Sequence, residues 1–490
     1  MTSLNSVKEQ HGEHGEHGDC GVLIAGAGPT GLTLACELAR RGVRVRLVER
    51  SDGLFPGSRG KGIQPRTLEV FDDLGIVDAV LRDGSPYPPM LRWKDGRPGD
   101  EFDLVQRGGP RPGAPYGEPW MLPQWRTQEL LYERLRELGG EVEFGRELTG
   151  VTQDAQGVTA HFAAGGPEPS VRARYLVAAD GGRSSVRSAL GIPMNGETLS
   201  AEPTRIADVR VAGLDRERWH VWEQPEGAML ALCPLPSTDA FQLIAQRASA
   251  DADIPGLVAA RTHLAADQVK EVLYASQFRA NAALADRFRE GRVFLAGDAA
   301  HIHSPAGGQG LNTSVQDAYN LGWKLARVLH GGADAALLET YEAERAPLAA
   351  AMLGLSTRLH RGFWARREPE THQLDLAYRD SPLSPVASAS PGGALRPGDR
   401  APDAPCGAGR LFDVFRGPHF TLLALGGAAP PAELSAAPSE RPQGGPEVRV
   451  HTLRAADGYA SPALYLVRPD GYLAVVTTDP ADVTGWLRDH

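Results

Sequence analysis

Residues 22–49, VLIAGAGPTGLTLACELARRGVRVRLVE, predict a strand, a glycine turn, a helix and a second strand. The apolar run 22–25 is typical of a short buried strand. Apolar residues then recur at helical spacing from about Thr30 to Arg41, and Gly42 is placed to end that helix. The second strand covers 43–48. This βαβ unit predicts an α/β fold with a Rossmann-type nucleotide-binding domain.

The turn has the pattern G-x-G-x-x-G, in which each glycine has its own task. Gly26 allows the tight turn, Gly28 lets the backbone approach a pyrophosphate, and Gly31 allows the helix to pack closely on the strand. Glu49 stands 23 positions after Gly26, where a carboxylate can accept hydrogen bonds from a ribose. The alternatives are a glycine turn without a ligand and a surface carboxylate at Glu49. The motif by itself does not distinguish FAD from NAD.

Two later segments distinguish FAD from NAD. They are AADGGRSSVR at 178–187 and GDAAH at 297–301, which continues to PAGGQGLN at 305–312. Taken with the first motif, in this order and spacing, they resemble the p-hydroxybenzoate hydroxylase class of FAD monooxygenases over about residues 21–350. The resemblance implies FAD, bound by a GR2-like Rossmann-type domain.

The resemblance also implies which residues contact FAD. Glu49 would hold the adenosine ribose with Arg50 beside it, and Asp298 would bind the ribityl chain. Asp180 would lie near the pyrophosphate and the path of the nicotinamide cofactor. A helix cap remains the alternative for Asp298, and a solvated side chain the alternative for Arg59. The implied FAD-binding residues are Gly26, Gly28, Pro29, Thr30, Gly31, Glu49, Arg50, Arg59, Gln124, Asp180, Gly297, Asp298, Pro305, Gly307, Gly308, Gln309, Gly310, Leu311 and Asn312.

The segment 305–312 precedes a long helix predicted from about Asn312 to Leu329. Its glycines can present backbone N–H groups, and the helix N-terminus carries about half a positive charge. Aimed at the flavin pyrimidine ring, this charge would stabilise reduced flavin. Pro305 would lie near the reacting edge of the ring. A tight turn that caps a core helix is compatible with this role.

The resemblance implies a hydroxylation in which the cofactor supplies the chemistry. NADPH or NADH would reduce FAD, and molecular oxygen would add to give a C4a-hydroperoxyflavin that hydroxylates an aromatic ring. No catalytic nucleophile is evident, and the sequence does not identify a base. Trp222, Met229 and Ala231 are candidate walls of the substrate site or, equally, plain core residues.

Further motifs are similar to those of actinobacterial hydroxylases that modify aromatic polyketides. They include RTLEVF at 66–71, YEAERAP at 341–347 and, in the tail, LRPGDRAPD at 395–403 and YLVRPDGYLA at 465–474. The C-terminal part of the chain resembles a thioredoxin-like domain without C-x-x-C, which implies a redox-inert, structural role. The implied substrate is a polycyclic phenol or quinone. Baeyer–Villiger and antibiotic-inactivating monooxygenases share these motifs and remain alternatives, as do a non-oxygenating flavoprotein and a non-catalytic binder.

The predicted organisation has five parts. Residues 1–20 form a disordered tail whose HGEHGEHG tract is too short and glycine-broken for a metal site, and 353–394 form a helix and linker. The FAD-binding domain is discontinuous, an antiparallel substrate domain is inserted into it, and a thioredoxin-like domain follows. The ranges are 21–82, 118–192 and 286–352 for the first, 83–117 and 193–285 for the second, and 395–490 for the third.

Composition narrows the function classes. The formal net charge of −10 argues against nucleic acid, because phosphate binding needs clustered Lys and Arg. No apolar run is long enough for a membrane helix, and no signal peptide is evident, so we expect a cytoplasmic protein. Four separated cysteines predict no disulfide, and His301 with His303 lacks a third ligand for a metal. The expected partner is a small aromatic substrate, and the expected assembly is a monomer or homodimer.

Overall fold

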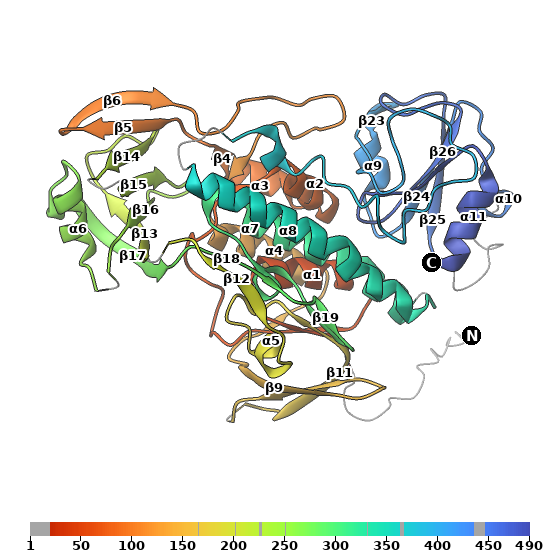
Figure 1. Cartoon of the computed structure of the whole chain (residues 1–490), viewed down its shortest axis with the longest axis horizontal. Helices are drawn as coiled ribbons and strands as arrows, with labels where there is room; N and C mark the ends of the chain where they lie inside the picture. The colour runs from red at the N-terminus through yellow and green to blue at the C-terminus, as the bar shows by residue number, and fades with distance from the viewer. Residues whose placement is uncertain are drawn as a thin grey trace, which may run out of the picture.

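The computed structural model describes residues 20–164, 166–200, 202–224, 228–249, 251–330, 332–362, 367–435 and 446–490. The predicted N-terminal tail with its histidine tract therefore lies outside the described residues, except Cys20, which begins the first strand. Figure 1 shows a helical layer in the middle of the molecule. One sheet lies below it, a second lies to the left, and the C-terminal part of the chain lies to the right.

The lower sheet is the predicted Rossmann-type sheet. Its order is β19-β20-β11-β1-β2-β8, and β10 and β9 extend it from β11. The pairs β2–β1, β1–β11 and β11–β20 are parallel, which confirms the βαβ unit read from residues 22–49. The strands are β1 (Cys20–Ala25), β2 (Val45–Val48), β8 (Val142–Glu143), β9 (Leu148–Gln153), β10 (Val158–Phe162), β11 (Ser170–Ala178), β19 (Arg289–Glu290) and β20 (Val293–Leu295).

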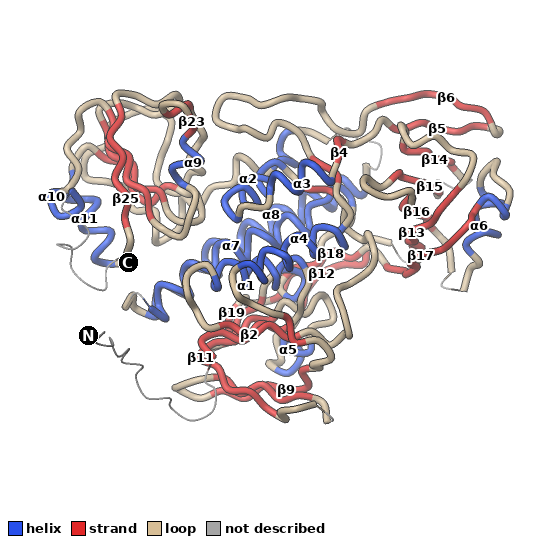
Figure 2. The backbone as a smooth tube through the Cα atoms, turned by 180° about the vertical axis from the view of Figure 1, so that it is seen from behind, coloured by secondary structure: helices blue, strands red, loops and turns tan. Residues whose placement is uncertain are grey.

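The helices of the central layer pack on this sheet and on one another (Figure 2). The first helix, α1, begins at Pro29, whose fixed φ suits the first turn of a helix. The seventh helix, α7, extends the predicted 312–329 helix at both ends. The helices of this layer are α1 (Pro29–Ala39), α2 (Pro65–Leu74), α3 (Val77–Asp83), α4 (Gln124–Glu137), α7 (Gln309–His330) and α8 (Glu339–Arg361). The short α5 (Ser185–Ala189) lies instead beside β9 of the lower sheet (Figure 1).

The second sheet is the predicted antiparallel sheet, apart from one parallel pair between β14 and β5. Its order is β17-β13-β16-β15-β14-β5-β6, so segments on both sides of residues 118–192 contribute to it. Two small sheets, β12-β18-β21 and β3-β7-β4, join it to the helical layer. The bounds are β3 (Gly62–Ile63), β4 (Ser85–Pro86), β5 (Met90–Lys94), β6 (Arg97–Phe102), β7 (Trp120–Met121), β12 (Met194–Thr198), β13 (Thr204–Val211), β14 (Trp219–Glu223), β15 (Met229–Pro234), β16 (Phe241–Gln246), α6 (Ile254–Arg261), β17 (Val269–Phe278), β18 (Asn281–Ala285) and β21 (His301–Ile302).

The C-terminal part is a mixed four-stranded sheet of order β25-β24-β26-β27, flanked by α11. Its last two strands form a hairpin whose turn contains Pro469-Asp470-Gly471. Cys406 is its one cysteine, so no C-x-x-C is present. The elements are β22 (Pro405–Cys406), β23 (Gly409–Arg410), α9 (Leu411–Phe415), β24 (Phe420–Leu425), α10 (Ala432–Ser435), β25 (Val448–Leu453), β26 (Ala463–Val467), β27 (Leu473–Thr477) and α11 (Pro480–Asp489).

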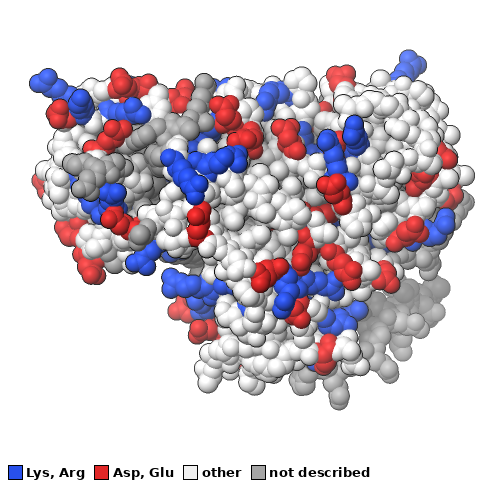
Figure 3. Space-filling model, viewed as in Figure 1, with Lys and Arg blue, Asp and Glu red and all other residues white. Residues whose placement is uncertain are grey.

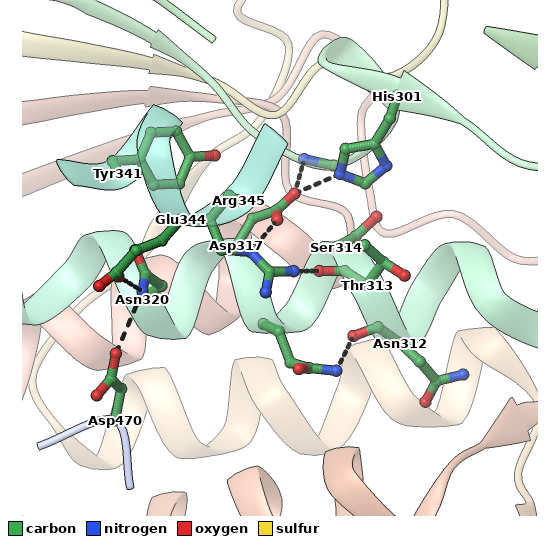
Figure 4. Close-up of polar contacts among 12 residues, drawn as sticks. His301, Asn312, Thr313, Ser314, Asp317, Asn320, Tyr341, Glu344, Arg345 and Asp470 are labelled. Atoms are coloured by element: carbon green, nitrogen blue, oxygen red, sulfur yellow. Dashed lines mark hydrogen bonds and ion pairs between the residues drawn. The ribbon is translucent and has the colours of Figure 1, made fainter. Parts of the chain in front are cut away.

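The β26–β27 hairpin is anchored to the helical layer by buried charges. Arg468 donates two hydrogen bonds to the carboxylate of Glu344 on α8, at 2.6 and 2.9 Å. It also pairs with Asp470, which accepts hydrogen bonds from Asn320 and Trp323 of α7. Figure 4 shows Asn320 between Glu344 and Asp470. These groups have almost no solvent contact, so each charge depends on its partner.

The surface contrasts with this interior. Acidic and basic side chains lie intermixed over the face drawn in Figure 3. Within the part of the chain that the structure describes, no helix combines the length and apolar character needed to cross a membrane.

Arg468→Met tests the anchoring of the hairpin. The change leaves Glu344 and Asp470 buried without their main counter-ion, and we expect a loss of about 3–5 kcal/mol in stability. Thermal unfolding should show a clearly lower midpoint. The control is Arg449→Met, which removes an exposed pair with Glu447 in the same sheet and should shift the midpoint little. Equal midpoints for the two variants would contradict the anchoring role.

Candidate active site

A cavity of about 800 Å³ lies where the three motif segments meet the second sheet. One part of its wall comes from the loops after β1, β2, β11 and β20 and from the segment before α7. Another part comes from β13, β14, β15 and β16. Of the predicted FAD-binding residues, the following line it: Gly26, Gly28, Pro29, Thr30, Glu49, Arg50, Arg59, Gln124, Asp180, Asp298, Pro305, Gly307, Gly308, Gly310 and Leu311.

The first glycine turn has the geometry that its three glycines predict. Gly26 has φ +104°, and a Cβ there would lie 2.4 Å from the carbonyl oxygen of Ala179. A Cβ on Gly31 would lie 1.9 Å from the carbonyl oxygen of Gly26, so only glycine allows α1 to begin here. By contrast, a Cβ on Gly28 would meet nothing within 4 Å. The backbone at Gly28 is therefore open for a ligand to approach.

Two carboxylates of this wall also brace the backbone. Glu49 accepts hydrogen bonds from the N–H groups of Ala27 at 2.9 Å and Ser51 at 3.0 Å, which fixes the glycine turn against the end of β2. Asp180 accepts one from Ser185 N at 2.9 Å through Oδ2. Its Oδ1 is buried and has no hydrogen-bond partner among the described residues. Both carboxylates can thus brace the backbone and contact a ligand in the cavity.

Asp298 follows β20 in a short 3₁₀ turn and opens on the cavity. Desolvation raises the pKa of its carboxyl, although His301 and Arg59 lower it. A carboxylate in this position gains from hydrogen-bond donors such as sugar hydroxyls. Arg59 itself is exposed and donates to Ser276 Oγ at 2.9 Å, and Gln124 Oε1 accepts from Gly60 N at 3.1 Å.

Four predicted FAD-binding residues do not line the cavity but support those that do. Gly31 and Gly297 allow close packing, and a Cβ on Gly297 would lie 2.6 Å from Thr30 Oγ1. Asn312 joins the glycine segment to β3, because its side chain bonds Gln64 N and the carbonyls of Gly62 and Gly308. Gln309 donates to the Gly307 carbonyl at 2.8 Å.

Asp317 on α7 is the centre of a buried network behind the cavity wall (Figure 4). Its Oδ2 accepts hydrogen bonds from Gly297 N at 2.9 Å and from His301 Nε2 at 2.6 Å. Its Oδ1 accepts from Arg345 Nε of α8 at 2.7 Å. His301 and Arg345 hold the pKa of Asp317 at about 2 in spite of its burial. The network positions the Asp298 turn against the start of α7.

Two of the three predicted substrate-wall residues, Ala231 and Trp222, do not line the cavity. Met229 lines the cavity, and Ala231 is buried on the same face of the sheet without lining the cavity. Trp222 was wrong as a wall residue: it pairs across the sheet with Leu230, one position out of phase with Met229, and so faces the other side. There it donates to His263 Nδ1 at 3.2 Å. The wall contains Trp219 instead, three residues earlier in β14.

Several cavity residues were not predicted. Lys61 and Gln64 follow Arg59, and Gln242 is a polar residue at an inward position of an apolar strand, a signal the sequence does contain. Arg367 and Thr371 come from a segment predicted only as helix and linker. Buried polar atoms of the lining lack hydrogen-bond partners among the described residues: Gln64 Oε1, Arg146 Nε, Trp219 Nε1, His303 Nδ1 and Arg367 Nη1. Such atoms, together with the open backbone at Gly28, fit a large polar ligand such as FAD.

The depressed pKa of Asp317 predicts an acid-sensitive fold. Its pKa of about 2 lies below the ordinary 3.8, so its stabilisation, about 2 kcal/mol, is complete above pH 4 and is lost as pH falls toward 2. Asp317→Asn should therefore lower the thermal midpoint markedly at pH 6 and less at pH 3. Asp100→Asn, an exposed change in β6, is the control. If the thermal midpoints of wild type and Asp317→Asn differ as much at pH 3 as at pH 6, the stabilising role of the network is contradicted.

Comparisons with known proteins agree with this geometry. A flavin-dependent monooxygenase of Mycobacteroides abscessus is 46% identical over 487 residues, which cover 95% of this chain and 99% of the relative. A 12-dehydrotetracycline 5-monooxygenase/anhydrotetracycline 6-monooxygenase of Streptomyces rimosus is 35% identical and covers 96% and 97% of the two chains. The crystal structure of aklavinone-11 hydroxylase with FAD and aklavinone superposes with a TM-score of 0.80 at 30% identity, covering 97% of this chain and 99% of that one.

Two family models account for most of the sequence. The model described as an FAD binding domain matches residues 19–356, and the model of the aromatic-ring hydroxylase C-terminal domain matches residues 394–489. Together with the relatives, they confirm the predicted fold class, the FAD cofactor and the resemblance to polyketide-modifying hydroxylases. The chain therefore belongs to the FAD-dependent aromatic-ring hydroxylases and is a flavin-dependent monooxygenase.

Proposed function

We propose that this monooxygenase uses NADPH or NADH and molecular oxygen to hydroxylate a polycyclic phenol or quinone. The observation that carries the proposal is the single cavity that joins the glycine segments and Asp298 to the wall formed by Trp219, Met229 and Ile244. Its volume of about 800 Å³ is large for a small-molecule site. Relatives named for tetracycline-type and aklavinone substrates support a fused-ring substrate.

In this proposal the three motif segments hold FAD with the roles predicted from the sequence. Bound FAD supplies the transfer of electrons from the nicotinamide to oxygen. Glu49 and Arg50 hold the adenosine ribose, Asp298 binds the ribityl chain, and Asp180 lies beside the pyrophosphate. The same proposal divides the chain into the discontinuous FAD-binding domain, the inserted substrate domain and the C-terminal domain.

The segment that begins at Pro305 acts by its backbone. A 3₁₀ turn, Ala306–Gly308, leads directly into α7, so several N–H groups have no carbonyl partner within the helix. Their partial positive charge stabilises negative charge on the isoalloxazine ring. Asn312 and Gln309 hold this turn in place. The apolar sheet wall opposite excludes water from the reacting ring edge.

Asp298→Ala tests the assignment of the ribityl site. Loss of charge-assisted hydrogen bonds should weaken FAD binding by about 10- to 100-fold, measured by titrating the apoprotein with FAD. Asp100→Ala, which removes an exposed carboxylate on β6, should bind FAD as wild type does. An Asp298→Ala protein that retains a full complement of FAD would refute the assignment.

Oxygen labelling tests the reaction. With NADPH or NADH, ¹⁸O₂ and a panel of anthraquinones and related polycycles, a substrate should accelerate flavin reduction in stopped flow and leave with one labelled oxygen atom. Loss of NAD(P)H without any labelled product across the panel would identify a non-oxygenating flavoprotein. A product with oxygen inserted into a ring carbon–carbon bond would identify Baeyer–Villiger chemistry.

A further inference from the structure

Lys61 is a buried amine on the cavity wall. Its side chain is 8% exposed, and its Nζ donates a hydrogen bond to Gln242 Oε1. The same Nζ lies 4.4 Å from the centroid of the Trp219 ring. Among the described residues, the polar and ring contacts of this amine are with Gln242 and Trp219, and neither partner is a carboxylate. Lys61 is thus held by a neutral amide and an aromatic ring.

The contacts of Lys61 place it at the sheet side of the cavity. Gln242 belongs to β16 and Trp219 to β14, and both line the cavity with Met229 of β15. Lys61 itself precedes β3, on the FAD-binding side of the cavity. The side chain of Lys61 therefore extends from an FAD-binding segment to the wall formed by β14 and β16. The proposed function places the substrate against this wall.

The surroundings of Lys61 favour a proton acceptor. Burial lowers the pKa of the amine, and Cys233 and Asp208 offset this effect in part. The carboxylate of Asp208 is already engaged by Ser58 N and Oγ. Burial raises the pKa of the hydroxyl of Tyr87, which lines the same cavity. An acidic hydroxyl that entered this space would give Lys61 both a proton and a counter-ion.

We propose that Lys61 binds the acidic hydroxyl of the aromatic substrate and accepts its proton. The substrate O–H bond breaks, an N–H bond forms at Nζ, and the electron pair stays on oxygen, which yields a phenolate paired with an ammonium group. The ring becomes more electron-rich and so more reactive toward an electrophilic oxygen. This inference rests on the proposed function and narrows the substrate to a polycyclic aromatic with an ionisable hydroxyl.

The test measures binding without turnover. FAD-loaded wild type and Lys61→Met are titrated with 2-hydroxyanthraquinone and its methyl ether across a range of pH. Wild type should bind the hydroxyl compound at least about tenfold more tightly and show its red-shifted phenolate band at a pH below its free pKa. Lys61→Met should lose the preference and the band but keep its affinity for the ether. Lys270→Met, which changes an exposed lysine of β17 that donates to the Asp267 carbonyl, is the matched control and should behave as wild type.

The alternative results are distinct. A preference and phenolate band retained by Lys61→Met, or absent from wild type, would overturn the inference. Lys61→Gln is a second variant that keeps a polar side chain, and failure of both variants to retain FAD would show that Lys61 only packs the site. The proposed function fails separately, in the labelling experiment, because the titration requires neither NAD(P)H nor oxygen.

Discussion

The arrangement of the site depends on the hydrogen bonds and ion pairs of one buried carboxylate, that of Asp317. From α7 it binds Gly297 and His301 of the segment that follows β20, and Arg345 on α8. Because all three groups are inaccessible to water, their hydrogen bonds hold one arrangement. That arrangement sets Asp298 and the start of α7 on the same wall of the cavity.

The C-terminal domain contacts the same two helices, α7 and α8, that carry the Asp317 network. Arg468 of its hairpin pairs with Glu344 of α8, which is adjacent to Arg345, and Asp470 accepts a hydrogen bond from Asn320 of α7. Tyr378 accepts a hydrogen bond from Arg345 at 2.9 Å, which links the segment after α8 to the Asp317 network. The domain has no C-x-x-C, and its contacts give it a role in bracing the two helices on which the site is built.

Local patterns allowed much of the fold to be predicted, together with many of the residues that line the cavity. Gly26, Gly28 and Gly31 carry their roles in their spacing, and Asp298 follows a recognisable strand. Trp222 could not be placed correctly because the face of a strand residue depends on register with β15, which one sequence does not reveal. Lys61, Arg367 and Asp317 acquire their roles only through contacts with residues distant in the chain.

We propose that the three motif segments seat the flavin ring between the start of α7 and the β14–β16 wall. A crystal structure of the FAD-loaded protein tests this most directly. We predict electron density for the pyrimidine edge of the ring against the backbone of residues 307–310, with the ribityl chain at Asp298. Density for FAD away from these residues, or a ring that contacts neither α7 nor the sheet, would contradict the account.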